Sequence, residues 1–308
     1  MLRVELRPAR KRQAGLTQRH FEQGQVENMN PHKLTCWKRR LLAFAVVCVC
    51  ALAATGCNKL RARDRLNKGV AAYKGGFYDE AAEYFKEAKE LDPTLMNARL
   101  YLATAYQSEY VPGAPSPENV RKGEEAVAEY KDILQSDPTN LNAIDGIGSM
   151  LFSMASNPYS PSKFEESKSY HQKHIQLRPD DAEPYYWIGV IDWTLAFRQN
   201  REMRQSYNQS HPPNKQVKDS EALPPSVRGE FASNYGAVID EGVKNLQQAL
   251  TLRPDYEDAM AYLNLLYRQK ADTVESAQER DALLKQADEL VDRVKEIKQK
   301  KAGTQQTS

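Results

Sequence analysis

The sequence predicts an all-α fold, a solenoid of helix pairs stacked in chain order, for most of its 308 residues. Three observations support it. Four amphipathic segments end in the same way, each at a proline: Pro93, Pro138, Pro179 and Pro254. Proline has no N–H and restricts the residue before it, so it ends a helix. A new helical apolar pattern begins within a few residues of each proline, and 41% of the residues are apolar, enough for a core.

Charge and cysteine content exclude two classes of protein. The net charge is +2, but residues 1–56 hold ten Lys and Arg against three Asp and Glu. The remainder has 33 basic and 38 acidic residues, and this acidic balance argues against general nucleic-acid binding. All four cysteines lie within the first 57 residues. The rest of the chain therefore has neither a disulfide framework nor a cysteine zinc site.

Residues 1–28 are polar and have no helical apolar period. They stand before Met29, from which a leader of ordinary length would begin. Two interpretations stay open for this segment: an untranslated stretch upstream of the true start, or a disordered extension.

Residues 29–56 have the pattern of a signal peptide. Lys38, Arg39 and Arg40 are followed by an uncharged run of 14 residues, 41–54, and then by small residues. A membrane-spanning helix needs about 20 apolar residues, so this run is short for a span.

The leader ends in Ala54-Thr55-Gly56-Cys57, which resembles the lipobox of bacterial lipoproteins. It departs from the family pattern at Ala54, where leucine is usual. The resemblance implies that Cys57 is diacylated and becomes the new N-terminus, followed by a linker over 57–61. Two or more acyl chains anchor a protein stably. The alternatives are a plain cleaved signal and an uncleaved anchor.

The first helix pair covers residues 62–95 and carries Gly69, Ala81, Phe85, Ala88 and Pro93 at a characteristic spacing. This pattern resembles a tetratricopeptide repeat. In that family, small residues stand where helices A and B of a repeat cross, and an aromatic side chain fills the space beside them. The resemblance implies a right-handed superhelical α-solenoid that binds other proteins.

Aligned on the prolines, the solenoid spans 62–301 and continues in four further repeats, over 96–140, 141–181, 182–256 and 257–298. The last predicted helix, Val274 to Lys300, has an apolar stripe that includes Leu283, Ala287 and Leu290. Its other faces are polar, which suits a helix that caps the solenoid. We expect residues 302–308 to be a disordered tail.

Successive prolines are 45, 41 and 75 residues apart, whereas the family repeat has 34. Each insertion falls between helix A and helix B. The largest, about 198–237, begins with a segment that extends helix A and continues with two Pro-Pro loops. Long insertions are usually either functional or disordered, and both interpretations stay open.

The family resemblance implies that helix A residues line a concave groove for a peptide. The candidate groove residues are Arg63, Leu66, Tyr73, Lys74, Asn97, Thr104, Asn142, Asp145, Phe152, Glu183, Tyr186, Trp193 and Arg268, with Val70 and Leu100 at equivalent positions. The asparagine–lysine clamp of the chaperone-binding members is not reproduced, so capture of an acidic C-terminus is not implied.

Tyr186 and Trp193, with Phe197 nearby, form a candidate aromatic binding cluster in the fourth repeat. Exposed aromatic side chains are frequent hot spots of interfaces. The alternative is that they pack between repeats, which we expect for Trp187.

No catalytic, cofactor or metal site is predicted. His171 and His174 are three residues apart on one helix, but no cysteine or suitably spaced carboxylate completes a ligand set. The nucleophile-elbow, zinc-protease and phosphate-loop motifs are all absent.

The sequence thus predicts a non-enzymatic, membrane-tethered adaptor of the bacterial cell envelope that binds proteins or peptide segments. We expect it to face the periplasm. Asn58, rather than aspartate, follows Cys57 and favours the outer membrane. Two alternatives remain: an accessory subunit of an envelope enzyme, glycan-processing or secretion complex that acts through the insertion, and a self-associating structural solenoid.

Overall fold

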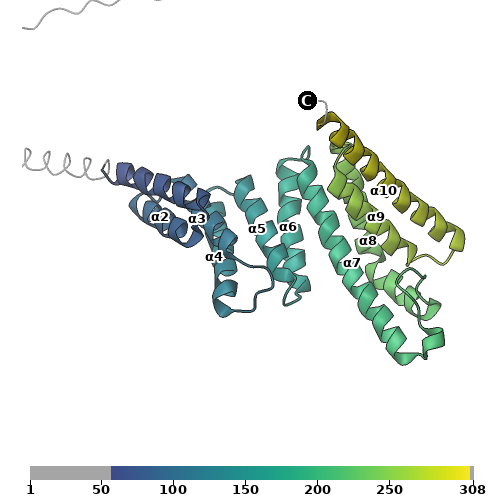
Figure 1. Cartoon of the computed structure of the whole chain (residues 1–308). Helices are drawn as coiled ribbons and strands as arrows, with labels where there is room; N and C mark the ends of the chain where they lie inside the picture. The colour runs from purple at the N-terminus through teal and green to yellow at the C-terminus, as the bar shows by residue number, and fades with distance from the viewer. Residues whose placement is uncertain (1–56, 306–308) are drawn as a thin grey trace, which may run out of the picture. The chain divides into compact units, whose positions relative to one another are not determined.

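The computed structural model describes residues 57–305, in the compact unit that begins at Cys57 (Figure 1). Within this part the regular secondary structure is helical, apart from one isolated bridge between Ser156 and Tyr159. The all-α prediction is therefore confirmed. The predictions for 1–28 and 29–56 lie outside the described residues.

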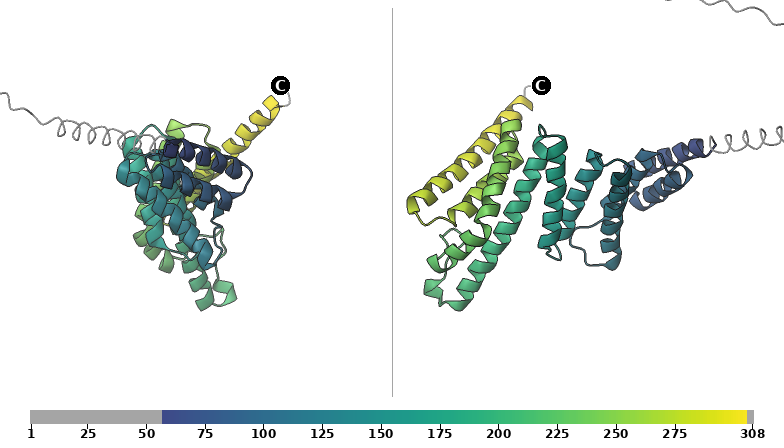
Figure 2. Two further views of the ribbon diagram at one scale, coloured as in Figure 1. Left: turned by 90° about the vertical axis from the view of Figure 1, so that its left-hand side faces the viewer. Right: turned by 180° about the vertical axis from the view of Figure 1, so that it is seen from behind.

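The helices form five consecutive pairs, stacked side by side in chain order (Figure 2). Each predicted repeat corresponds to one pair, although the first pair begins before residue 62 and the last ends after residue 298. The pairs are residues 57–74 with α2 (Tyr78–Leu91), α3 (Met96–Glu109) with α4 (Pro117–Ser136), α5 (Leu141–Ala155) with α6 (Pro161–Leu177), α7 (Ala182–Ser210) with α8 (Pro225–Leu252), and α9 (Glu257–Ala271) with α10 (Ala277–Gln305).

The second helix of each of the first four pairs ends two residues before its proline. The last N–H bonds are made by Asp92, Asp137, Arg178 and Arg253, each to the carbonyl four residues earlier. In the turn that follows α2, the Asp92 carboxylate accepts hydrogen bonds from both the N–H (3.1 Å) and the hydroxyl (2.6 Å) of Thr94. Such side-chain turns satisfy the backbone where the proline interrupts the helix.

The two helices of a pair cross at a glycine, which has no side chain. A Cβ on Gly69 would lie 2.5 Å from the Phe85 ring, and one on Gly148 would lie 2.8 Å from the His171 ring. The close approach buries Phe85 to 1% exposure. The pairing of a small residue with a large one therefore lets the two helices of a repeat pack closely.

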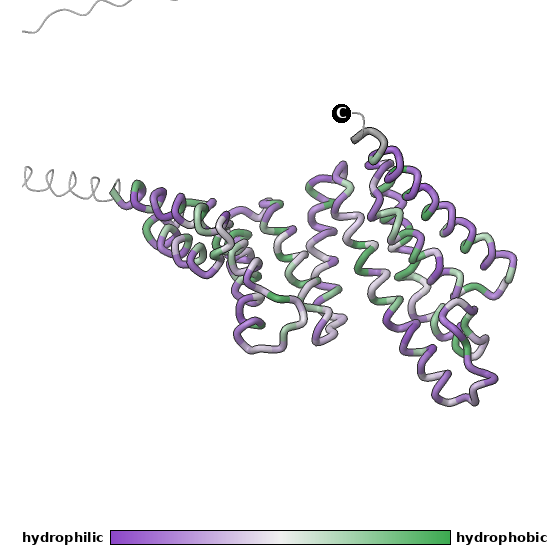
Figure 3. The backbone as a smooth tube through the Cα atoms, in the orientation of Figure 1, coloured by the Kyte–Doolittle hydropathy of each residue, from purple (hydrophilic) through white to green (hydrophobic). Residues whose placement is uncertain are grey.

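The C-terminal helix α10 covers α9 with one face. Leu283 and Ala287 are buried, and Leu290 packs on the large apolar cluster of the fourth and fifth repeats. Its other residues are mostly hydrophilic (Figure 3), as expected for the cap of a solenoid.

Two predicted boundaries need correction. Residues 57–61 are helical and continue into the first helix, instead of forming a linker. Helix α10 begins at Ala277 and extends to Gln305, so residues 302–305 of the expected tail are helical as well. Both segments lack proline and have strong helix formers beside them, which allows an existing helix to propagate.

The large insertion is ordered. It extends α7 to Ser210, as the sequence predicts, and continues through a short 3₁₀ turn, Pro213–Lys215. Leu223 is 1% exposed and anchors the loop in the apolar cluster of the fourth and fifth repeats. Helix α8 then begins at Pro225, so the last part of the insertion, up to residue 237, is helical and lengthens the second helix of the repeat.

Arg204 holds this insertion against the fifth repeat. Its guanidinium donates to the carbonyls of Lys218 (2.8 Å) and Glu221 (3.0 Å), and to Asp272 Oδ2 (2.9 Å) at the end of α9. Asn200 also donates to Asp272 Oδ2, at 3.0 Å. Arg204 is 4% exposed, so water does not replace these bonds.

We expect Arg204→Lys to loosen the insertion without unfolding the solenoid. An ammonium keeps the charge but lacks the planar fork that serves three acceptors, and each buried bond lost costs about 1 kcal/mol. Hydrogen exchange of the amides in 216–223 should accelerate about tenfold, whereas Arg201→Lys, at an exposed position of α7, should leave it unchanged. Unchanged exchange in Arg204→Lys would show that the loop is held by packing alone.

Candidate peptide-binding groove

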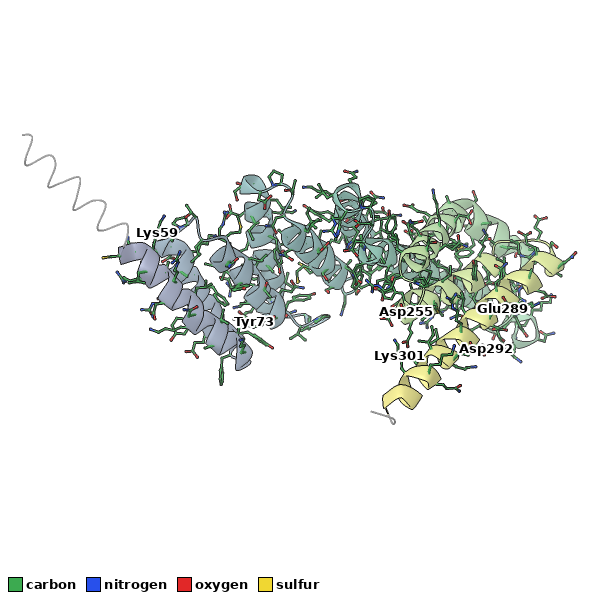
Figure 4. The ribbon with its side chains drawn as sticks, turned by 90° about the horizontal axis from the view of Figure 1, so that it is seen from above. Lys59, Tyr73, Asp255, Glu289, Asp292 and Lys301 are labelled. Carbon is green, nitrogen blue, oxygen red and sulfur yellow. The ribbon has the colours of Figure 1, made fainter. Side chains whose placement is uncertain are left out.

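A cavity of about 600 Å³ opens between the first helices of the first three repeats, residues 57–74, α3 and α5. Its lining residues are Val70, Tyr73, Lys74, Phe85, Asn97, Leu100, Tyr101, Thr104, Tyr130 and Asn142. Tyr73 is labelled in Figure 4. The volume lies within the range of sites that hold a ligand or a short peptide segment.

Helical spacing explains why these side chains meet. Asn97, Leu100, Tyr101 and Thr104 follow the i, i+3, i+4, i+7 spacing of one helix face and share that face of α3. Asn97 is the second residue of its helix, and Asn142 is the second residue of α5, so the repeat places the two amides in equivalent positions. The groove is thus a consequence of stacking like helices.

Internal hydrogen bonds hold the floor of the cavity in place. The Tyr130 hydroxyl donates to Gln107 Oε1 at 2.8 Å, and the Thr104 hydroxyl donates to the Leu100 carbonyl at 2.9 Å. The Tyr73 hydroxyl lies 2.9 Å from Ser108 Oγ. Burial raises the pKa of Tyr130, which therefore stays a neutral donor. A floor fixed in this way loses little conformational entropy when a ligand binds.

The rim carries polar groups that are free to bind. Lys74, Asn97 and Asn142 are exposed, and in the described part of the chain their side chains form no hydrogen bond or ion pair. Lys74 is the charged residue among those that line the cavity. Two amides and one ammonium above an apolar floor suit a peptide backbone with an apolar side chain and an adjacent carboxylate.

The structure thus brings together Tyr73, Lys74, Asn97, Thr104 and Asn142 of the predicted groove residues, with Val70 and Leu100. Arg63 is exposed but does not line the cavity, and Leu66 packs on the core of the first repeat.

The predicted polar groove residues of the later repeats have partners within the chain. Asp145 Oδ1 lies 2.7 Å from His174 Nδ1, and burial raises the pKa of this carboxyl against that bond. Glu183 accepts from the Tyr256 hydroxyl at 2.8 Å. Arg268 pairs with Asp288 at 2.5 Å.

The predicted aromatic residues of the later repeats pack mainly against one another. Phe152 contacts Phe164 and Trp187 edge-on. Trp193 stacks on Phe197, with ring centroids 4.9 Å apart, and meets the edge of Tyr262 at 5.3 Å. Tyr186 contacts Tyr256 and Tyr262. These half-buried rings favour the packing interpretation of the cluster.

The two histidines are packing residues. His171 stacks on Trp187 with the rings 9° from parallel, and burial lowers its pKa to about 4, so the ring is neutral. His174 is engaged by Asp145. Among the described residues no group of three His, Cys, Asp or Glu side chains is arranged to hold a metal ion.

Phe85, Tyr101 and Tyr130 line the cavity although the groove positions did not include them. Phe85 and Tyr130 come from the second helices of their repeats, α2 and α4, whereas the predicted groove residues all belong to first helices. Tyr101 is 37% exposed, and its position directly after Leu100 is the sequence signal that could have identified it.

Comparisons with known proteins agree with this architecture. Residues 62–95 match the family model described as tetratricopeptide repeat. No curated protein matches the chain. The solved structure titled "Crystal structure of MamA protein" has a TM-score of 0.50 at 15% identity, covering 79% of this chain and 94% of that one.

A second structure, MamA 41-end from Desulfovibrio magneticus RS-1, has the same TM-score and identity, with coverages of 78% and 96%. At this identity the likeness concerns the fold alone. The described part of the chain is therefore an α-solenoid with the fold of tetratricopeptide-repeat proteins, and residues 62–95 are the repeat that matches the tetratricopeptide family model.

Proposed function

We propose that this chain is a membrane-tethered adaptor that binds segments of partner proteins in the groove of its first three repeats. The observation that carries the proposal is the cavity itself. Three successive repeats contribute to it, its floor is fixed, and its rim presents unpaired amides and one ammonium. Nothing in this arrangement resembles a reaction centre, since the lining residues include no nucleophile paired with a base.

The tether is proposed from Cys57 and the sequence before it. Cys57 is exposed at the start of the first described helix, directly after the uncharged run and the lipobox-like residues. None of the described helices is long and apolar enough to cross a bilayer. Acyl chains on Cys57 would hold the solenoid at the envelope, facing the periplasm, with Asn58 favouring the outer membrane.

We expect the double variant Asn97→Ala, Asn142→Ala to lose at least tenfold in affinity for the partner that wild type captures from envelope extracts. Both side chains are exposed and unpaired within the chain, so their loss removes ligand contacts and leaves the fold intact. Affinity is measured on the captured partner by titration.

The matched control is Gln135→Ala, Gln172→Ala, which removes two exposed amides from α4 and α6. It should bind as wild type. Equal binding by all three proteins contradicts the groove, and capture of a second copy of this chain instead supports the self-associating alternative.

A further inference from the structure

The first described helix is strongly basic, whereas the rest of the unit that begins at Cys57 is net acidic. Residues 57–74 contain six Lys and Arg and one Asp, whereas residues 75–308 contain 27 basic and 37 acidic residues. Figure 4 shows Lys59 at the N-terminal end of the stacked helices, while Asp255, Glu289 and Asp292 lie among the last repeats. The first described helix thus carries a net positive charge, whereas residues 75–308 taken together are net negative.

Part of this charge is not neutralised within the protein. Arg65 pairs with Glu87 and Lys68 with Asp64, at 2.8 and 3.0 Å. Lys59, Arg61 and Arg63 are exposed and form no ion pair in the described structure.

The acidic group whose pKa these cations lower is Asp92, at the end of α2. Hydrogen bonds from Thr94 chiefly hold the pKa of Asp92 low, with smaller contributions from Lys59 and Arg63. A single carboxylate leaves most of the basic charge facing solvent.

An apolar side chain lies within this basic turn. Leu60 is 72% exposed, and the inward position of the turn is taken by Ala62, which is fully buried. An exposed leucine with three cations within three positions of it on the helix has the make-up of a surface that meets lipid headgroups while inserting one apolar group.

Chain connectivity places this turn close to a membrane. The uncharged run 41–54 ends three residues before Cys57. Whether Cys57 carries acyl chains or the run stays as an uncleaved anchor, residue 59 follows the anchoring point within a few residues, about 3.5 Å each at most. Anionic lipid attracts each Lys or Arg near its surface by about 1 kcal/mol.

We propose that Lys59, Leu60, Arg61 and Arg63 form a membrane-contact surface for anionic phospholipids. The acidic repeats then point away from the bilayer, which keeps the groove open to the aqueous side. The proposal takes the location of the surface from the proposed tether, but lipid binding itself is measured without the anchor.

The experiment uses residues 57–308, the compact unit described above, with Cys57→Ser and folding checked by circular dichroism. Co-sedimentation is measured with phosphatidylcholine vesicles that contain either no or about one-third phosphatidylglycerol. We expect binding to the anionic vesicles only, lost in high salt because the attraction is screened. Lys59→Glu, Arg61→Glu, Arg63→Glu should lower the partition coefficient more than tenfold, since each cation contributes about fivefold.

The control Lys215→Glu, Lys218→Glu, Lys244→Glu makes the same change in net charge at exposed positions of the insertion and α8, and should bind as wild type. Equal loss in both variants, equal binding to neutral vesicles, or no binding at all overturns the proposal. The groove variant Asn97→Ala, Asn142→Ala should keep full vesicle binding, which separates failure of this surface from failure of the groove.

Discussion

Replacing Lys168 with methionine is expected to lower the free energy of unfolding by about 3–5 kcal/mol, the cost of removing one partner of a buried ion pair. Lys168 is 6% exposed, and its Nζ lies 2.7 Å from Asp192 Oδ1 and 2.8 Å from Glu241 Oε2. These three residues join α6, α7 and α8. Asp192 is fully buried, so without the ammonium its charge has no partner.

The loss of stability in Lys168→Met should depend on pH in a defined direction. Burial raises the pKa of Asp192 to about 7, against the opposing attraction of Lys168. Without Lys168 the folded pKa rises further above the unfolded value, so folding binds a proton. The variant is then most unstable above pH 7 and recovers as the pH falls towards 5, where the protonated carboxyl needs no cation.

Urea unfolding at pH 8 and pH 5 measures both effects. Adding Asp192→Leu to the variant should restore at least half of the lost stability, because no buried charge remains. The control Lys173→Met changes a lysine of α6 that has no ion pair and should cost less than about 0.5 kcal/mol. Equal effects of Lys168→Met and Lys173→Met at pH 8 would mean that the buried pair contributes nothing.

Gly189→Ala is expected to destabilise the protein by about 1–3 kcal/mol, although alanine is the better helix former. A Cβ at this position of α7 would overlap Leu246, which is fully buried where α7 and α8 cross. Leu246 touches the new atom through its branch point, so rotation of its methyl groups does not relieve the contact.

Gly236→Ala provides the matched control in the same helix pair. An added Cβ there meets nothing within 4 Å. The higher helix propensity of alanine therefore determines the effect, and the free energy of unfolding should rise by up to about 1 kcal/mol. Thermal unfolding of the two variants should therefore shift in opposite directions. A stabilising Gly189→Ala would show that the fourth repeat is not closely packed at this crossing.

The helix pairs were readable from the sequence because their signals are local. Pro93 and its equivalents end helices through the chemistry of one residue, and Gly69 with Phe85 marks a crossing within one repeat. Each of the five predicted repeats contains one helix pair.

The ordered structure of the insertion could not be predicted from local signals. It depends on Arg204 reaching Asp272, a residue 68 positions away, and on burial of Leu223. Similarly, nothing near Lys168 in the sequence indicates Asp192 or Glu241 as partners. From the sequence alone, polar side chains on a helix are expected to be exposed to solvent unless their distant partners are known.

The groove was predicted in part. The repeat pattern predicted Asn97 and Asn142 as equivalent positions, because it fixes which face of helix A is concave. It did not show that Asp145 and Arg268 would be engaged within the chain, since these contacts depend on neighbouring helices. The pattern also could not decide between the two interpretations of Trp193, which packs on Phe197 and Tyr262.

The most direct test of partner binding in the groove is site-specific photo-cross-linking from position 97 of the full-length protein in bacterial cells, with position 172 as the control. Asn97 lies on the rim of the cavity and Gln172 on the exposed side of α6. The account predicts one or a few discrete cross-linked proteins from position 97 and none of these from position 172. Cross-links from position 172 alone, or the same products from both positions, would contradict a partner-binding groove in the first three repeats.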